Sequence, residues 1–110
     1  METKTVYDDD ITVKSDNLLE LFDDITQKIE TGIDKGWLKQ RNLMYIKDIQ
    51  DMYEHQERFK SAGDGIDTIM YYIQQAESNG VPTEKNTRQL MSDLGVLQSK
   101  LHKKSDYYSE

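Results

Sequence analysis

Cysteine is absent from this chain of 110 residues, which excludes disulfides, thiolate chemistry and zinc sites built on cysteine. Proline occurs once, at Pro82, and no apolar run approaches the ~20 residues that a membrane-crossing helix needs. The first ten residues, METKTVYDDD, have no apolar stretch after a basic flank, so they do not match the pattern of a secretory signal. We therefore expect a cytoplasmic protein, or one of the host cytoplasm if the chain is viral, without a membrane partner.

Apolar residues are also scarce: they make up 35% of the chain, against 32% charged residues. A chain this polar can bury only a thin core. That composition suits one elongated helical domain, or a subunit that completes its core by association. The sequence thus favours a homodimer or a higher oligomer.

The net charge of −7 is concentrated at one end of the chain. Residues 1–34 hold ten acidic residues and three lysines, whereas residues 35–110 hold eleven acidic and eleven basic residues. Such an asymmetry indicates a specific charged surface. The acidic interaction face that we predict comprises Asp16, Glu20, Asp23, Asp24, Glu30 and Asp34.

A first helix is predicted over residues 16–35, after a flexible acidic tail at 1–14. Ser15 or Asp16 can cap its N-terminus, and Gly36 can supply the left-handed residue that follows a helix. Its apolar residues recur at steps of three and four, which places them on one helical face. They are Leu18, Phe22, Ile25, Ile29 and Ile33.

A heptad pattern runs through residues 37–79 and keeps its phase across Gly63 and Gly65. Two interpretations follow: one long helix, continuous or gently kinked at 63–65, or two helices joined by a turn at these glycines. In either case the apolar positions predict a core or oligomer seam. Its members are Leu38, Tyr45, Ile49, Met52, Phe59, Ile66, Met70 and Ile73.

The stretch from Asn79 to Pro82 predicts a clear break, and Thr83 can cap a last helix over 83–105. The apolar face of that helix holds Leu90, Leu94, Leu97 and Leu101. Residues 107–110 are expected to fray. The predicted fold is all-α, a single domain over 15–106. We expect an antiparallel, coiled-coil-like bundle of three long helices, or four shorter ones if the chain turns at Gly63–Gly65.

Motifs for catalysis, metals or cofactors are missing. His55 lies between Glu54 and Glu57 but lacks the His-Glu-x-x-His spacing that places two ligands on one helical face. The Gly63–Gly65 segment lacks the Lys-Ser/Thr of a phosphate loop. We therefore predict no enzyme activity, no metal site and no cofactor.

The composition and charge leave three candidate functions. The first is a self-associating protein-protein interaction module, an assembly, adaptor or regulatory subunit. The second is a small acidic inhibitor of the phage or mobile-element type, whose first helix mimics nucleic acid and blocks a basic site. The third is a helical nucleic-acid-binding accessory protein, for which the basic clusters are Lys35, Lys39, Arg41 and Lys47, and Lys100, Lys103 and Lys104.

Tyrosines off the heptad stripe are candidates for contact with a protein partner. Tyrosine is enriched at the centres of protein interfaces. The tyrosines that the pattern leaves free are Tyr53, Tyr72 and Tyr107.

Overall fold

The computed structural model of the chain describes residues 16–78 and 85–108, which form four α-helices. These are α2 (Asp16–Asp34), α3 (Gln40–His55), α4 (Phe59–Ser78) and α5 (Lys85–Tyr108). At 1.5 Å per residue, the 24 residues of α5 extend over about 36 Å. The predicted tail at 1–14, and the predicted break and cap at 79–83, lie outside the described residues.

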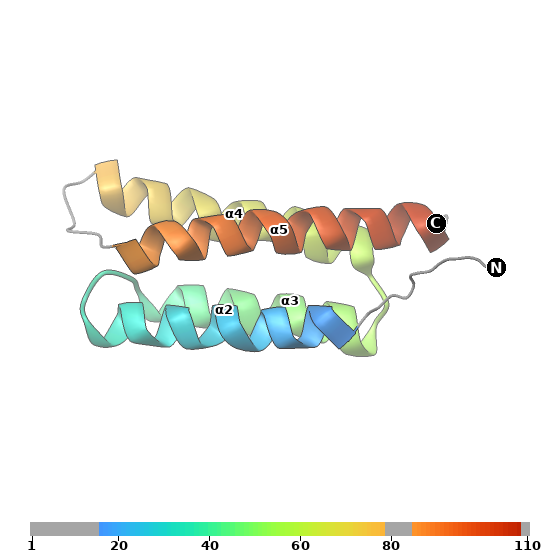
Figure 1. Ribbon diagram of the computed structural model, residues 1–110, viewed down its shortest axis with the longest axis horizontal. Helices are drawn as coiled ribbons and strands as arrows, with labels where there is room; N and C mark the ends of the chain where they lie inside the picture. Colours follow the sequence, from blue (N-terminus) through green and yellow to red (C-terminus); the bar gives the residue numbers. More distant parts are fainter. Residues whose placement is uncertain (1–15, 79–84, 109–110) are drawn as a thin grey trace.

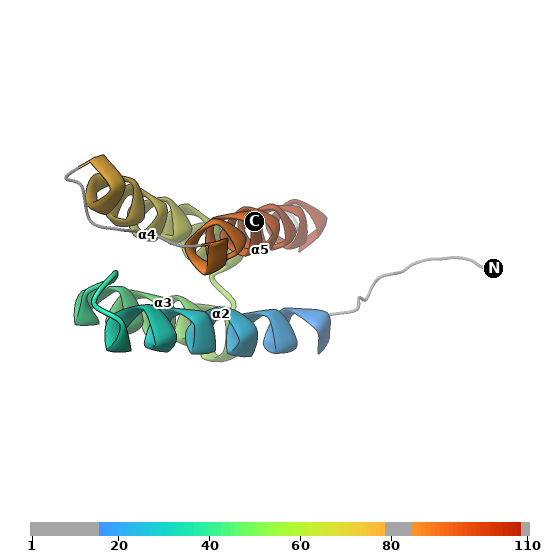
Figure 2. The ribbon, with the colours of Figure 1, turned by 60° about the vertical axis from the view of Figure 1, so that its left-hand side comes forward.

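The helices form an antiparallel bundle in which each helix packs against two neighbours (Figure 1). α2 and α3 make one layer, and α4 and α5 make the other (Figure 2). Around the bundle the order is α2, α3, α4, α5, and α5 closes the ring by packing on α2. The predicted all-α antiparallel bundle is therefore confirmed, and it has four helices.

The core is formed by the apolar stripes that the sequence periodicity predicts. On α2 the buried residues are Leu18, Phe22, Ile25 and Ile29, and on α5 they are Leu90, Leu94, Leu97 and Leu101. Burial of each such side chain stabilises the fold by about 1.5–3 kcal/mol. Ile33, in the last turn of α2, is only partly buried and packs against the edge of this core.

Gly36 ends the first helix as predicted. Its φ of +84° is left-handed, a conformation that costs glycine little. The N–H of Trp37 donates to the carbonyl of Gly32 over 2.8 Å, and that of Gly36 donates to the carbonyl of Ile33 over 3.1 Å. This pair of hydrogen bonds is the Schellman motif, which satisfies the last carbonyls of the helix.

The chain turns at residues 56–58, so both predictions for the middle segment were wrong. There is no continuous helix over 37–79, and Gly63 and Gly65 lie inside α4 and form no turn. The turn depends on Glu57, whose φ is +50°, and the N–H of Arg58 donates to the carbonyl of Met52 over 3.1 Å. Because glutamate rarely adopts a left-handed conformation, the sequence carries no signal for this turn.

Gly63 and Gly65 allow α4 to approach its neighbours closely. A Cβ placed on Gly63 would lie 2.5 Å from Cδ2 of His102 on α5. A Cβ on Gly65 would lie 3.1 Å from Cγ1 of Ile49 on α3. The glycines therefore serve close helix packing, which outweighs their low helix propensity.

The predicted seam packs within the single chain. Leu38, Ile49, Phe59, Ile66 and Ile73 are buried. Tyr45, Met52 and Met70 are partly buried against the same core. Five of the eight residues thus lie inside one bundle, and the other three pack at the edge of its core.

Asn42 on α3 is a polar residue inside this core. Only 2% of its surface is exposed, and its Oδ1 has no hydrogen-bond partner among the described residues. The buried residues of α3 are Asn42, Ile46, Ile49 and Tyr53.

Among the helices described, none is long and apolar enough to cross a membrane.

Candidate functional site

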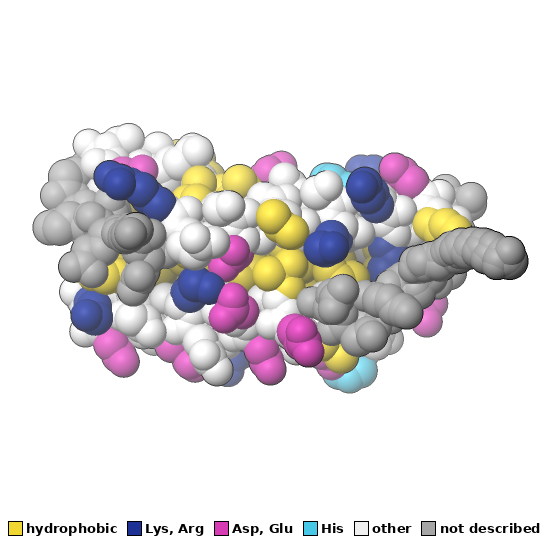
Figure 3. All heavy atoms as spheres, in the orientation of Figure 1, with side chains coloured by type: hydrophobic (Ala, Val, Ile, Leu, Met, Phe, Trp, Pro, Cys, Tyr) yellow, Lys and Arg dark blue, Asp and Glu magenta, His cyan; other side chains and the backbone are white. Residues whose placement is uncertain are grey.

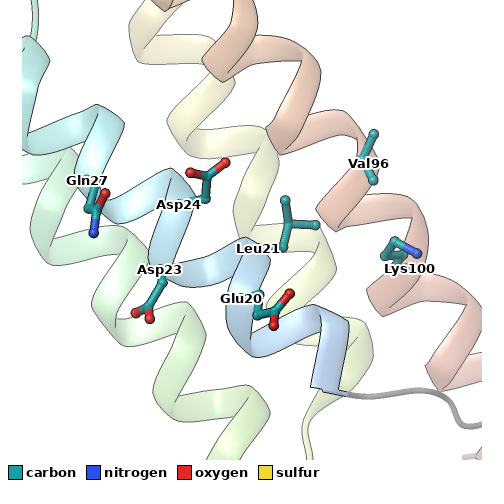
Figure 4. A pocket seen from close by; sticks show the side chains of 7 residues that line it. All are labelled: Glu20, Leu21, Asp23, Asp24, Gln27, Val96 and Lys100. Atoms are coloured by element: carbon teal, nitrogen blue, oxygen red, sulfur yellow. The ribbon is translucent and has the colours of Figure 1, made fainter.

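A groove of about 600 Å³ lies between α2 and α5 (Figure 4). It is lined by Glu20, Leu21, Asp23, Asp24, Gln27, Val96 and Lys100, and we call these seven residues the groove. Leu21 points from α2 toward α5, and Val96 and Lys100 stand on α5 (Figure 4). Two neighbouring antiparallel helices therefore build the site.

Leu21 and Val96 give the groove an apolar surface. Leu21 packs partly buried against the core, whereas 45% of the surface of Val96 is exposed. In the view of Figure 3, apolar side chains show in a band between α5 above and α2 below. An apolar surface bordered by charged residues is typical of a site that binds another molecule.

Carboxylates border the groove on the α2 side. The residues of α2 include six carboxylates and one lysine, a net charge of −5, whereas those of α5 include five bases and two carboxylates, a net charge of +3. Yet within the described part of the chain, no ion pair joins a carboxylate of α2 to a base of α5. The exposed carboxylates of α2 that form no ion pair there are Glu20, Asp23, Glu30 and Asp34.

Lys28 ties α2 to α5 beside the groove. Its Nζ lies 2.8 Å from Oδ2 of Asp24 and 2.9 Å from Oδ2 of Asp93 on α5. The hydrogen bond to Asp24 raises the pKa of Lys28 most, and the bond to Asp93 raises it further, against the lowering by burial. Lys28 therefore stays charged, and Asp24 is the one groove carboxylate that already has a cationic partner.

The bundle has a different surface where α3 meets α4. The ring of Tyr72 on α4 stacks on that of Tyr45 on α3, with centroids 5.8 Å apart and planes 9° from parallel. The guanidinium of Arg41 lies 3.8 Å from the centroid of the Tyr72 ring, and Tyr71 meets that ring edge-on. A hydrogen bond with Tyr72 is the main cause that raises the pKa of Tyr45. We call these four residues the aromatic face.

The tyrosines predicted for partner contact have three different environments. Tyr53 is a correction: it is buried, with its ring centroid 5.6 Å from that of Phe22 and 6.0 Å from that of Phe59. It lies in the core because the buried stripe of α3 runs through Ile46 and Tyr53, one position beyond the Tyr45 and Met52 of the predicted heptad. Tyr72 belongs to the aromatic face, and Tyr107 is exposed on α5.

Neither histidine belongs to the groove. Nδ1 of His55 lies 2.8 Å from Oδ1 of Asp51, and this hydrogen bond is the main cause that raises the pKa of His55. Nε2 of His102 lies 2.9 Å from Oδ1 of Asp64 and links α5 to α4. Over residues 16–78 and 85–108, no cluster of three or more His, Asp or Glu side chains could hold a metal ion.

The basic residues near the start of α3 are partly engaged with aromatic rings of their own chain. Nζ of Lys35 lies 5.7 Å from the ring centroid of Trp37, and Arg41 covers Tyr72. Lys39 and Lys47 are exposed.

Sequence reasoning did not predict the groove, although it contains two apolar residues that depart from the helix patterns. Leu21 and Val96 lie beside the main apolar stripes of their helices. A stripe widened on the flanks of two adjacent helices is the signal that could have indicated the groove. No family model matches the chain, and neither a curated protein nor a solved structure does.

Proposed function

We propose that this protein is a non-catalytic protein-protein interaction module, an adaptor or regulatory subunit that binds its partner in the groove between α2 and α5. The observation that carries the proposal is the combination of exposed apolar surface with two carboxylates, Glu20 and Asp23, that form no ion pair with a described residue. Apolar area supplies most of the free energy of protein association, and charges at its border select the partner.

The arrangement of ionisable groups favours binding over catalysis. General acid-base catalysis needs groups that converge on one substrate atom. The carboxylates of the groove are exposed and follow one another along a single helix, and no histidine lines the groove. A surface of this kind suits recognition of an extended partner.

A partner of a different sequence is favoured over a second copy of the chain. The eight seam residues that the sequence offered for self-association pack on the core of one bundle, five of them buried and three partly buried. Dimerisation through that seam would require the bundle to open, at the cost of its core contacts.

The acidic inhibitor is the second candidate, and one observation favours it. Glu20, Asp23, Glu30 and Asp34 stand exposed along α2, as a row of phosphates stands along a nucleic acid. That function would use the whole row, whereas an interaction module needs only the part that borders the groove. Nucleic-acid binding has less support, because two of the four bases near α3 lie over aromatic rings of the chain.

Partner capture with two matched variants tests the proposal. The immobilised wild-type chain, Val96→Lys and Met44→Lys are each incubated with a lysate of the source cells, and bound proteins are identified by mass spectrometry. Met44 is the control, because it is 62% exposed on α3, away from the groove. We expect a protein that the wild type and Met44→Lys retain and Val96→Lys loses. Equal capture by all three chains would contradict the proposal.

A further inference from the structure

Resting on the proposed function, we infer that the segment bound in the groove is a basic amphipathic helix of the partner protein. Its apolar side chains would contact Leu21 and Val96, and its lysines or arginines would lie beside Glu20 and Asp23. Three features of the groove favour this occupant: its shape, its charge, and the difference between its two walls.

The shape suits a helix. The groove is formed between two neighbouring antiparallel helices, and a third helix can lay a ridge of side chains along such a groove. On α2 the lining residues extend from Glu20 to Gln27, about two helical turns, or roughly 10 Å. A partner helix with apolar residues three, four and seven positions apart would place two or three of them over this length.

The charge suits a basic segment. Glu20 and Asp23 line the groove without an ion pair in the described part of the chain, and α2 as a whole has a net charge of −5. Lysine or arginine on the partner would form ion pairs with these carboxylates. An acidic helix would be repelled by the same wall.

The two walls of the groove differ, and this difference determines how the partner is oriented. Lys100 stands on the α5 wall, opposite the acidic wall of α2 (Figure 4). A partner helix with bases only on the flank that faces α2 would meet complementary charge on that side and no like charge at Lys100. A helix with bases all round would meet Lys100 with like charge.

The experiment measures binding of synthetic peptides to the full chain by fluorescence anisotropy at low salt. The probe is a labelled helical peptide of about 14 residues with leucine on one face, lysine on one flank and glutamine elsewhere. Its companion has glutamate in place of every lysine. We expect the lysine peptide to bind with an affinity that falls as salt screens the charges, and the glutamate peptide not to bind.

Two pairs of matched variants locate the binding. Glu20→Gln with Asp23→Asn removes the two groove carboxylates that form no ion pair with a described residue, and Lys28 keeps its bonds to Asp24 and Asp93. Glu30→Gln with Asp34→Asn removes as much charge from the same helix outside the groove. The first pair should weaken binding about tenfold and the second less than about twofold. Val96→Ser should weaken it about threefold, and Met44→Ser should leave it unchanged.

Each other outcome overturns the inference in a distinct way. Equal losses from the two charge pairs would show that binding uses the whole acidic row, which is the inhibitor alternative. No binding of the lysine peptide, or equal binding of the glutamate peptide, would reject a basic helix as the occupant. In those cases capture that depends on Val96 would still support the proposed function, so the two failures are distinguishable. Circular dichroism of each variant verifies that the bundle is intact.

Discussion

Two sides of the bundle share the same helix packing but differ in their surface residues. One side lies between α3 and α4, and the other lies between α2 and α5. On each side two antiparallel helices place apolar stripes in a common core. Between α3 and α4, Tyr45 and Tyr72 stack across the junction, and Arg41 covers Tyr72. Between α2 and α5, the corresponding space is bordered by Leu21, Val96 and carboxylates, and a groove remains.

The comparison shows that the residues beside an apolar stripe determine whether the outer edge of a helix junction is filled by side chains. Large aromatic side chains fill the outer edge of a helix junction and contact each other. Short apolar and acidic side chains leave room and leave charges without partners. We therefore expect the aromatic face to contribute mainly to stability, and we propose the groove as the surface that binds the partner.

Removal of the Tyr72 ring should have the largest effect on the difference in stability between the two sides. Tyr72→Ala loses the stack on Tyr45, the contact with Arg41 and part of the core packing, so we expect a loss of about 2–3 kcal/mol in the free energy of unfolding. Val96→Ala on the groove should cost less than ~0.5 kcal/mol, because the site is open. Urea denaturation measures both. Equal losses would mean that the two sides are equally sealed.

Asn42 is a buried polar residue on α3, and its replacement by an apolar residue should increase the stability of the α3–α4 side further above that of the α2–α5 side. Its Oδ1 is buried without a hydrogen-bond partner, which costs about 1–3 kcal/mol. Asn42→Leu replaces the amide by an apolar group of similar size, so the free energy of unfolding should rise by about 1–2 kcal/mol. A rise in the thermal midpoint would support this account. A lower midpoint would show that the amide makes a contact that the bundle needs.

A smaller gain is expected at the turn between α3 and α4. Glu57 has a φ of +50°, which costs a residue with a Cβ about 1 kcal/mol. Glu57→Gly removes this strain but frees the unfolded chain, so the net gain should be about 0.5 kcal/mol. Glu57→Ala is the control, since it keeps the Cβ and should bring no such gain. If both variants are equally stable, the turn is not strained.

The smallest effect concerns pH at the end of α3. Asp51 accepts hydrogen bonds from His55 and Gln56 and raises the pKa of His55 above its ordinary 6.5. The stability that this pair contributes is complete below 6.5 and is lost as pH rises through the raised pKa of His55. At the acid end, the lowered pKa of Asp51 means that its own contribution is lost only as pH falls through that value.

Nuclear magnetic resonance titration of the His55 ring checks this arrangement. In Asp51→Asn the midpoint should fall toward the ordinary value, because the main cause of the raised pKa is removed. Asp48→Asn neutralises another exposed carboxylate of α3 and serves as the control. A midpoint that Asp51→Asn does not move would contradict the observed pairing.

The sequence predicted the elements whose signals are local. The stripes of α2 and α5 follow from residue spacing, and the end of α2 follows from Gly36, which has the left-handed φ expected there. The turn at 56–58 was missed because Glu57 takes its conformation from the surrounding structure. The heptad also continues across this turn, since Met52 and Phe59 lie seven positions apart and both face the core.

The groove could be predicted only in part. The acidic residues of α2 were identified from charge alone, and Glu20, Asp23 and Asp24 do line the groove. The rest depends on which helices become neighbours, because Val96 and Lys100 reach Leu21 only when α5 packs on α2. Helix order around a bundle is a tertiary property, which the spacing within one helix does not determine.

We propose that the partner binds on the α2–α5 side, and this binding site can be located by mapping the chemical shifts of the backbone amides. The lysine peptide is titrated into the isotope-labelled chain, and the amide resonances of all four helices are followed. Our account predicts shifts concentrated at Glu20–Gln27 and Val96–Lys100, with those of Arg41, Tyr45 and Tyr72 unmoved. Shifts concentrated on the aromatic face, or spread evenly over the bundle, would contradict it.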